Sequence, residues 1–321
     1  MNIQSPYDCE FVEDPFNPDS EVLVLKQTWL FGRNNAPRRG KVKDVYEINH
    51  NYLVIYFTDR ISAFDVVLPS LIPYKGYSLT GLSAYWFREG RKIYPNHLVD
   101  VIDINVIKVL KTQRIDIEWI ARKYLYGSLW REYSRGRREF YGTKLPEGLN
   151  LAQELPDIIV TPTTKSEIGH DREISKEDAI RRGLLTRDEW KELEEITIKL
   201  FEFYERKARQ RGIILADLKL EFGRYGDMLI QIDEPPTHDS ARLWIEEDYE
   251  EGRLQVDNCL DKEYLREYLR RIGFRGDGKP PKLSRKVVIE VSKRCMASYL
   301  VLSGRKSIKD FSFTPINEVI K

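Results

Sequence analysis

The sequence predicts an α+β protein of two lobes, a β-rich N-terminal lobe over residues 1–113 and a second α+β lobe over residues 114–321. A chain of 321 residues is long enough to bury two separate cores. Short apolar segments rich in β-branched and aromatic residues dominate the first part, which predicts antiparallel strands. Beyond residue 114, helical and strand patterns alternate, and helical patterns close the chain.

In the N-terminal lobe, the first residues carry no pattern, and strands then flank a connector with the sequence FGRNNAPRRG. Apolar spacing predicts one helix over residues 80–94. The strands expected in this lobe cover residues 21–30, 41–48, 52–59 and 99–110. This part of the chain is therefore expected to form an antiparallel sheet with one helix.

The second lobe begins with a strand expected at residues 117–125. Residues 145–174 are rich in Pro, Thr, Gly and charge without a period, which is typical of a long functional loop or a lobe boundary, and a loop near the active site is favoured. Thr186 and Glu189 have the spacing of a capping box, and helical apolar spacing follows as far as Lys207. Two C-terminal helices are expected over residues 262–272 and 285–302.

Residues 213–222 and 228–233 alternate around a glycine-containing turn, which predicts a β-hairpin. Alternation places Asp217, Lys219 and Glu221 on one face, and Asp233 ends the returning strand. Such carboxylates suit Mg²⁺, although a solvated strand face with charges of alternating sign is the other interpretation. A hairpin centred on the residue before Gly226 pairs Asp233 with Asp217 and leaves Glu221 about 13 Å along the strand. The metal hypothesis then needs a shifted register or more than one ion.

Four short motifs combine glycine or hydroxyl groups with charge and favour anion binding. In the first, Gly40, Lys41 and Lys43 lie where a connector enters a strand, so backbone N–H groups and lysines can hold nucleotide phosphates. The others, each equally compatible with ordinary polar turns or helix capping, contain Ser62 and Asp65, Arg122 with Gly127 and Ser128, and Asp239 with Arg242.

The composition excludes several function classes. A net charge of +1 provides no global field for nucleic acid or an anionic membrane, and the basic turn at Arg135–Arg138 is more typical of a solvated surface. The polar, acidic N-terminus and the lack of an apolar run of about 18 residues predict neither export nor membrane insertion. Three scattered cysteines indicate neither a disulfide framework nor a zinc site, so a cytoplasmic protein is expected.

Together, the motifs and their order resemble the SAICAR synthase (phosphoribosylaminoimidazole-succinocarboxamide synthase) family. The matching segments run from about Gly40 to the C-terminal helices and include RGKVKDVYE, DRISAFDVVLPSLIPYKG, IEWIARKYLYGSLWREY, TPTTKSEIGHDREIS, ADLKLEFG and IDEPPTHDSARLW. The resemblance implies a kinase-like or ATP-grasp-like N-terminal ATP-binding lobe. It also implies a ligase of purine biosynthesis that joins L-aspartate to carboxyaminoimidazole ribonucleotide (CAIR) with ATP and Mg²⁺.

The resemblance further implies roles for individual residues. Gly40, Lys41, Lys43 and Lys165 would bind ATP, and Glu221 and Asp233 would hold Mg²⁺ beside ATP. The ribonucleotide and its phosphate would meet Ser62, Asp65, Arg122, Ser128, His170, Asp239 and Arg242, and the catalytic group would comprise Asp171, Asp217 and Lys219. Tyr126, Leu129 and His238 depart from the usual family pattern.

The reaction class explains why several anion-binding sites are needed and why the sequence shows no obvious covalent nucleophile. The γ-phosphoryl group of ATP first activates the carboxylate, and the aspartate amine then displaces phosphate, with lysines and Mg²⁺ stabilising the charge. The general base stays open between Asp217, Asp171 and the substrate phosphate. Another ATP-dependent ligase or small-molecule kinase on the same scaffold is the alternative enzyme, and a non-catalytic nucleotide-binding regulator is disfavoured because Lys41, Lys43, Glu221 and Asp233 are all present. The sequence also allows a homodimer.

Overall fold

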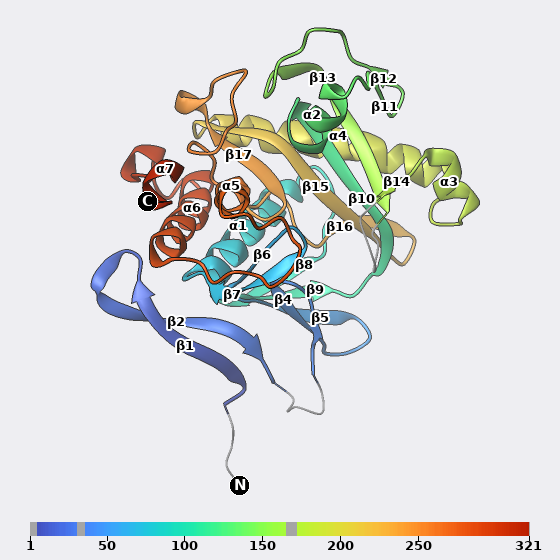
Figure 1. Cartoon of the computed structure of the whole chain (residues 1–321). Helices are drawn as coiled ribbons and strands as arrows, with labels where there is room; N and C mark the ends of the chain where they lie inside the picture. Colours follow the sequence, from blue (N-terminus) through green and yellow to red (C-terminus); the bar gives the residue numbers. More distant parts are fainter. Residues whose placement is uncertain (1–4, 31–35, 165–171, 321) are drawn as a thin grey trace. The chain divides into compact units, whose positions relative to one another are not determined.

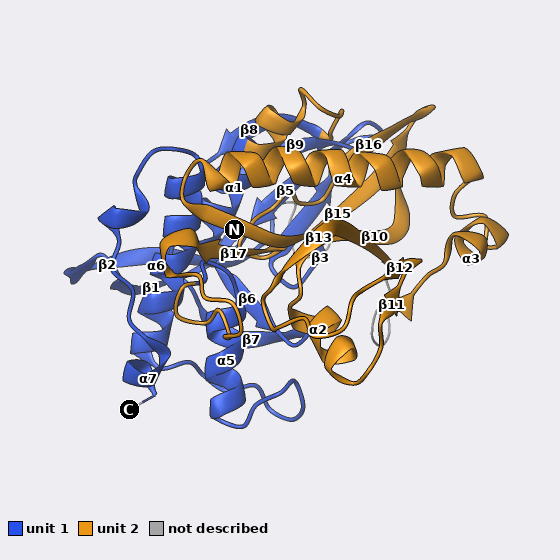
Figure 2. Cartoon of the chain, turned by 90° about the horizontal axis from the view of Figure 1, so that it is seen from above, with its two compact units in different colours: residues 1–85, 98–111, 259–321 blue, residues 86–97, 112–258 orange. Residues whose placement is uncertain are grey.

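The computed structural model describes residues 5–30, 36–164 and 172–320 (Figure 1). The chain forms two compact units, each built from separate stretches of sequence (Figure 2). Unit 1 comprises Met1–Tyr85, Leu98–Lys111 and Cys259–Lys321, and unit 2 comprises Trp86–His97 and Thr112–Asn258. The predicted α+β class with antiparallel sheets is confirmed.

Unit 1 is built on a five-stranded antiparallel sheet of order β3-β4-β5-β9-β8. Two hairpins, β1–β2 and β6–β7, accompany this sheet. The strands of the unit are β1 (Tyr7–Asp14), β2 (Asn17–Thr28), β3 (Arg38–Arg39), β4 (Lys43–Glu47), β5 (Tyr52–Phe57), β6 (Arg60–Ala63), β7 (Val66–Leu71), β8 (Leu98–Asp103) and β9 (Val106–Leu110). One sheet face and β2 share a core of Leu25, Tyr46, Val54, Tyr56 and Val106, because strand alternation directs these apolar side chains to one side.

The helices of unit 1 pack closely against one another. They are the first part of α1 (Lys75–Gly90), α5 (Glu263–Arg271), α6 (Arg285–Leu302) and α7 (Ile316–Val319). Ser292 on α6 donates a 2.6 Å hydrogen bond to the carbonyl of Pro73, and a Cβ at Gly81 on α1 would overlap the ring of Tyr299 on α6. The C-terminal helices therefore group with unit 1, whereas the predicted division placed them in the second lobe.

Unit 2 is built on a six-stranded antiparallel sheet of order β14-β13-β10-β15-β16, in which β17 also pairs with β15. The strands of this sheet are β10 (Gln113–Tyr124), β13 (Glu154–Thr164), β14 (Arg172–Glu173), β15 (Ile213–Tyr225), β16 (Met228–Ile232) and β17 (Ala241–Ile245). A separate two-stranded sheet consists of β11 (Glu139–Phe140) and β12 (Thr143–Lys144). Helices α2 (Gly127–Ser134), α3 (Lys176–Arg181) and α4 (Arg187–Arg209) complete unit 2. The long helix α4 runs along the central strands β10 and β15 (Figure 2) and buries Trp190, Leu193 and Leu200.

Several local predictions are confirmed. Thr186 caps α4 by accepting a 3.2 Å hydrogen bond from the amide of Glu189, and the Glu189 carboxylate accepts one of 2.7 Å from the amide of Thr186. The helix ends before Gly212, and the predicted hairpin is present as β15 and β16. The two C-terminal helices also lie where their apolar spacing places them.

Three local predictions are wrong. The N-terminal segment without a pattern contains strand β1, which pairs with β2. Residues 99–110 are a hairpin of two strands, β8 and β9. The loop expected at residues 145–174 contains strand β13, which pairs with β10 inside the sheet of unit 2. Each of these strands takes its position from a partner strand, which periodicity in a single segment does not reveal.

Candidate active site

Charged side chains gather on one face of the sheet of unit 2. The register of β10 with β15 sets Glu118 beside Glu221 and Arg122 beside Asp217, and Arg242 on β17 pairs with Asp217 from the other side. Paired residues of neighbouring antiparallel strands point to the same face, and the opposite face packs against α4. We define the polar face as Glu118, Arg122, Asp217, Lys219, Glu221 and Arg242.

Two arginines converge on Asp217. Nη1 of Arg122 lies 3.4 Å from Oδ2 of Asp217, and Nη1 of Arg242 forms an ion pair with the same oxygen. Nε of Arg122 also donates a 3.0 Å hydrogen bond to the hydroxyl of Thr161 on β13. Burial lowers the pKa of Arg122, and the charge of Asp217 opposes that shift. Because two guanidinium groups share one carboxylate, this part of the face retains one net positive charge, which favours a phosphate or carboxylate ligand.

The start of helix α2 lies against Arg242. Gly127 has φ of +60°, and a Cβ at this position would overlap Nη2 of Arg242. The guanidinium carbon of Arg242 lies 5.3 Å from the ring centroid of Tyr126, the residue that precedes the helix. The N-terminal amides of α2, beginning at Gly127 and Ser128, therefore lie beside a cation, an arrangement that favours an anion.

Lys219 lies between two buried carboxylates. Its Nζ donates a 2.6 Å hydrogen bond to Glu118 and one of 2.9 Å to Glu221, whose side chains are 8% and 2% exposed. Burial acts to lower the pKa of Lys219, but the charges of Glu221, Glu118 and Asp233 raise the pKa well above its usual value. Lys219 is therefore an ammonium ion at neutral pH and does not serve as a base there.

The hairpin register differs from the simple one and brings Asp233 closer to Glu221. Tyr225 pairs with Met228 and Glu221 pairs with Ile232, so Asp233 directly follows the residue opposite Glu221. The predicted pairing of Asp233 with Asp217 is wrong, and the alternative of a shifted register is correct. Asp233 has φ of +60°, which marks a sharp end to β16. The turn is shorter than the sequence suggested because Arg224 and Tyr225 extend β15.

Glu221 and Asp233 offer the oxygen ligands that Mg²⁺ prefers. The charges of both carboxylates raise the pKa of Lys219, so both lie near this side chain. Within residues 5–30, 36–164 and 172–320, no group of three or more His, Cys, Asp and Glu side chains is arranged to hold a metal ion. A two-carboxylate set fits Mg²⁺ when substrate phosphates and water supply the remaining ligands, as is usual for this ion.

The predicted ATP-binding residues of unit 1 form a compact turn, here called the lysine turn (Gly40–Lys43). The amide of Gly40 donates a 2.8 Å hydrogen bond to the carbonyl of Lys43. Arg60 stabilises the turn. It donates 3.2 Å hydrogen bonds to the carbonyls of Gly40 and Lys41 and one of 2.8 Å to buried Asp44. Lys41 forms an exposed ion pair with Asp65, whereas Lys43 is buried and its Nζ lies 5.2 Å from the ring centroid of Phe57.

The remaining predicted site residues are spread over both units. Ser62 is buried on β6 in unit 1. In unit 2, Asp239 lies in the turn before β17, where its amide donates a 3.2 Å hydrogen bond to the hydroxyl of Thr237. Lys165, His170 and Asp171 lie outside the described residues.

Sequence reasoning assigned no role to three residues that the structure places in these clusters. Glu118 binds Lys219, Tyr126 lies under Arg242, and Arg60 holds the lysine turn. The position of Glu118 could have been predicted from the sequence, because two residues four apart on a strand, here Glu118 and Arg122, point to the same face. Arg60 and Tyr126 stood within sequence motifs, but their contacts come from tertiary packing, which the motifs alone do not show.

Comparison with known proteins identifies the family. A family model described as SAICAR synthetase matches residues 37–282. The phosphoribosylaminoimidazole-succinocarboxamide synthase of Bacteroides fragilis is 42% identical over 292 residues, covering 89% of this chain and 93% of that protein. The synthase of Thermodesulfovibrio yellowstonii is 38% identical over 284 residues, covering 83% of this chain and 94% of that protein.

Solved structures agree with this assignment. A SAICAR synthase from Saccharomyces cerevisiae, in complex with SAICAR, is similar with a TM-score of 0.75 at 32% identity, over 86% of this chain and 97% of that chain. A SAICAR synthetase solved in complex with ADP gives a TM-score of 0.61 at 28% identity, over 77% of this chain and 100% of that chain. By the match of the family model and the identity and coverage of these relatives, the chain belongs to the SAICAR synthetase family.

Proposed function

We propose that the polar face of unit 2 carries the joining of L-aspartate to CAIR, giving SAICAR, ADP and phosphate. Family membership makes the chain an ATP-dependent ligase of purine biosynthesis. The observation that carries the proposal is the sharing of Asp217 by Arg122 and Arg242 beside the start of α2. That cluster suits the phosphate of a ribonucleotide, because guanidinium groups and helix N-terminal amides are strong phosphate donors.

The ribonucleotide is proposed to lie along the polar face, with its phosphate at Arg122, Arg242 and Ser128. Asp239 is proposed to contribute a further hydrogen bond to the same substrate, and His170 is a further proposed contact. Ser62, in unit 1, keeps the substrate-binding role that the family resemblance implies. The carboxylate of the ribonucleotide would then lie toward Lys219 and Glu221, which follow Asp217 at alternate positions on β15. Alternate side chains on one strand are about 7 Å apart, so Lys219 lies about 7 Å and Glu221 about 13 Å along the strand from Asp217.

Activation of the carboxylate is proposed to proceed through an acyl phosphate. A carboxylate oxygen attacks the γ-phosphorus of ATP, the bond to the bridging oxygen breaks, and ADP leaves. The aspartate nitrogen then attacks the acyl carbon, the C–O bond to phosphate breaks, and the amine proton passes to a base. Lys219 is held as an ammonium ion by Glu118 and Glu221, so its proposed role is to stabilise the negative charge that develops on the carboxylate and phosphoryl oxygens.

The nucleotide phosphates are proposed to bind at the lysine turn of unit 1. Lys41 and Lys43, with the amide of Gly40 and with Lys165, would supply the positive charge. Glu221 and Asp233 would hold Mg²⁺, whose bound form supplies Lewis-acid polarisation of the phosphoryl oxygens. An N-terminal lobe of kinase-like construction is part of this proposal, supported by the antiparallel five-stranded sheet from which the lysine turn projects.

The candidates for the general base are unequal in the structure. The carboxylate of Asp217 already accepts hydrogen bonds from two guanidinium groups, Arg122 and Arg242, and is engaged in holding them. Lys219 is protonated. We therefore favour Asp171 or the phosphate of the activated substrate as the proton acceptor.

Isotope transfer tests the proposed chemistry directly. CAIR labelled with ¹⁸O in its carboxylate is incubated with ATP, Mg²⁺ and L-aspartate, and the released phosphate is analysed by mass spectrometry. The acyl phosphate predicts one ¹⁸O atom in each phosphate, because the carboxylate oxygen that attacked phosphorus leaves with it. Unlabelled phosphate would show that ATP is cleaved without activating this carboxylate, and it would point to a different acceptor.

No described helix has the length and hydrophobicity needed to cross a membrane, as judged over residues 5–30, 36–164 and 172–320. A cytoplasmic location is proposed for the enzyme, supported by its three thiols, none of which is paired with another in a disulfide.

A further inference from the structure

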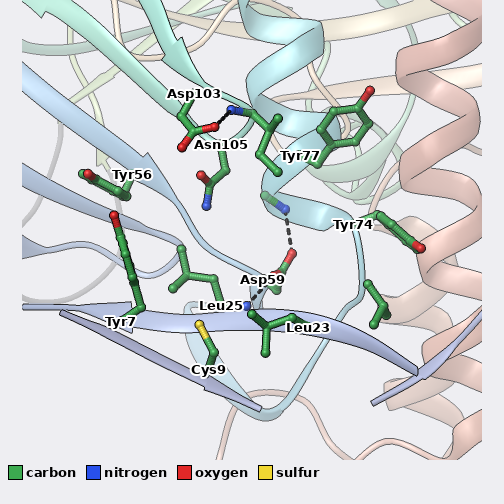
Figure 3. Close-up of a pocket in the computed structure, with 13 residues that line it drawn as sticks. Tyr7, Cys9, Leu23, Leu25, Tyr56, Asp59, Tyr74, Tyr77, Asp103 and Asn105 are labelled. Atoms are coloured by element: carbon green, nitrogen blue, oxygen red, sulfur yellow. Dashed lines mark hydrogen bonds between the residues drawn. The ribbon is translucent and has the colours of Figure 1, made fainter. Parts of the chain in front are cut away.

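A second pocket, separate from the polar face, lies entirely within unit 1. It is enclosed by the β1–β2 hairpin, the β8–β9 turn and the start of α1, and its volume is about 510 Å³. Figure 3 shows Tyr7 and Tyr56 at one end and Tyr74 and Tyr77 at the other, with Asp59 and Asn105 between them. The volume lies within the range of about 300–1,000 Å³ that is typical of small-molecule sites.

The pocket is also separate from the lysine turn. Strand pairing sets Lys43 opposite Phe57 and Asp44 opposite Tyr56, so Lys43 and Tyr56 point to opposite faces of the five-stranded sheet. The wall formed by the β1–β2 hairpin lies within residues 7–28, before the segment 37–282 that matches the family model. The pocket therefore depends on a part of this chain that the family match does not include.

The lining of the pocket has a clear chemical bias. Four tyrosine rings and several aliphatic side chains form its walls, and Asp59 and Asp103 supply two carboxylates. Among the described residues that line it, none is Lys, Arg or His. On the lining itself, a phosphate or carboxylate ligand would meet two carboxylates and no cation, whereas an organic cation would meet aromatic faces and carboxylates, both of which attract it. Buried Lys75 acts on Asp59 but does not line the pocket.

The two carboxylates occupy different surroundings. Asp59 is buried and accepts hydrogen bonds of 2.7 Å from the amide of Leu25 and 2.9 Å from the amide of Gly76, and the amide and the charge of Lys75 also act on it. A carboxylate has about four lone-pair positions, so these three amides leave room for one further donor. Asp103 is the exposed last residue of β8 and accepts a 2.7 Å hydrogen bond from the amide of Ile104 in the turn that follows. Both can accept from an ammonium group without giving up the contacts that hold them in place.

We propose that this pocket binds a small organic monocation, an ammonium group carried on an aromatic or alkyl body. The ammonium group is placed between the carboxylates and the tyrosine rings, and the apolar body lies against Leu23 and Leu25 of the hairpin. Selectivity for positive charge is the distinguishing property of the site, since its apolar walls alone would accept a neutral ligand equally well.

Three probes with the same phenylethyl body and head groups of different charge test the proposal. Phenethylammonium, 2-phenylethanol and 3-phenylpropanoate are titrated into the full chain at pH 7.5 and low salt by calorimetry. We expect phenethylammonium to bind about tenfold more tightly than the alcohol, and the anion to bind more weakly than both. Saturating MgATP leaves the affinity for phenethylammonium unchanged, because the two sites are separate. Equal affinity for the three probes, no binding of the cation, or competition by MgATP would overturn the proposal.

Two substitutions in one hairpin provide a matched pair. Asp103→Asn removes a pocket carboxylate and is expected to weaken phenethylammonium binding about threefold to tenfold. Asp100→Asn is the control, because Asp100 accepts a hydrogen bond from the next amide just as Asp103 does but does not line the pocket. Both are exposed carboxylates on strand β8, so neither change is expected to unfold the chain. An equal effect of the two substitutions would contradict a site at this pocket.

Discussion

At Gly127 the backbone and a neighbouring side chain constrain the same residue. The φ angle of +60° disfavours any L-residue with a Cβ, and the space where a Cβ would lie is taken by the guanidinium of Arg242. The sequence motif placed this glycine at a helix start, and that position is confirmed. Its partner Arg242 lies 115 residues further along the chain, and only the pairing of β15 with β17 brings the two together.

Replacing Gly127 by Ala is expected to displace Arg242 and raise KM for the ribonucleotide by about tenfold, a loss of one charge-assisted hydrogen bond. Gly183→Ala is the matched control, because Gly183 has a similar φ of +68° but nothing lies within 4 Å of its would-be Cβ. Both variants should lose roughly 1 kcal/mol of stability from the backbone alone. Steady-state kinetics separate them, and an unchanged KM in Gly127→Ala would show that Arg242 does not hold the substrate.

Lys219→Met is expected to destabilise the fold at neutral pH by about 3–5 kcal/mol, because Glu118 and Glu221 lose the cation that neutralises them. Urea unfolding at neutral pH measures it. Lys123→Met is the control, since Nζ of Lys123 donates a 3.0 Å hydrogen bond to the carbonyl of Pro156 and lies 3.8 Å from the exposed carboxylate of Glu154, at a partly exposed position on the same sheet. An equal loss of stability in Lys219→Met and Lys123→Met would contradict the proposed charge balance.

At the scale of elements, helix α4 was predictable because its signals are local. The cap, the first-turn carboxylates and the apolar spacing all lie within one segment, and the structure has the predicted capping box. Strand β13 was not predictable on the same terms, because its Pro- and Thr-rich sequence becomes a strand only through pairing with β10. The register of β15 with β16 depends on where the turn begins, and alternation alone leaves that open.

Thr186→Ala is expected to lower the free energy of unfolding by about 1 kcal/mol, through loss of the side-chain oxygen that accepts from the amide of Glu189. Thr186→Ser keeps that oxygen and should stay within a few tenths of a kcal/mol of the original chain. Chemical denaturation of the two variants measures the difference. Equal stability of the alanine and serine variants would show that the cap does not contribute.

Asp59 joins two elements, because its carboxylate accepts from Leu25 on β2 and from Gly76 on α1. Burial raises the pKa of Asp59 from 3.8 to about 6, despite the opposing effects of those amides and of Lys75. A raised acid pKa contributes stability below pH 3.8, and that contribution is lost as the pH rises through 6. The total change is about 3 kcal/mol.

The measurement is urea unfolding between pH 4 and 7 for the original chain and for Asp59→Asn. The original chain should lose more stability across this range than the variant, since the variant has no carboxyl group to titrate at this position. The charged or titratable groups that act on Asp59 include Lys75 and Cys9, and both stay unchanged in the comparison. Identical pH profiles would show that the pKa of Asp59 is not raised.

For the molecule as a whole, the sequence predicted the α+β class, the family and the segments that carry charge. The predicted boundary at residues 113–114 lies beside the start of the Thr112–Asn258 stretch of unit 2. The return of the last 63 residues to unit 1 was not visible, because α6 packs on α1 through Gly81 and Tyr299, far apart in sequence. Likewise, strand pairing brings Arg122, Asp217 and Arg242 together, whereas the sequence alone showed only the motifs that contain them.

The most direct measurement is ADP release by the purified chain with ATP, Mg²⁺, CAIR and L-aspartate, omitting each component in turn, and repeated with Glu221→Gln and Lys41→Ala. We predict turnover that requires all four components and falls by on the order of 10²-fold or more in each variant, because each removes charge stabilisation from phosphoryl transfer. ADP release at the same rate without L-aspartate, or full activity in both variants, would contradict an aspartate ligase that uses the polar face and the lysine turn.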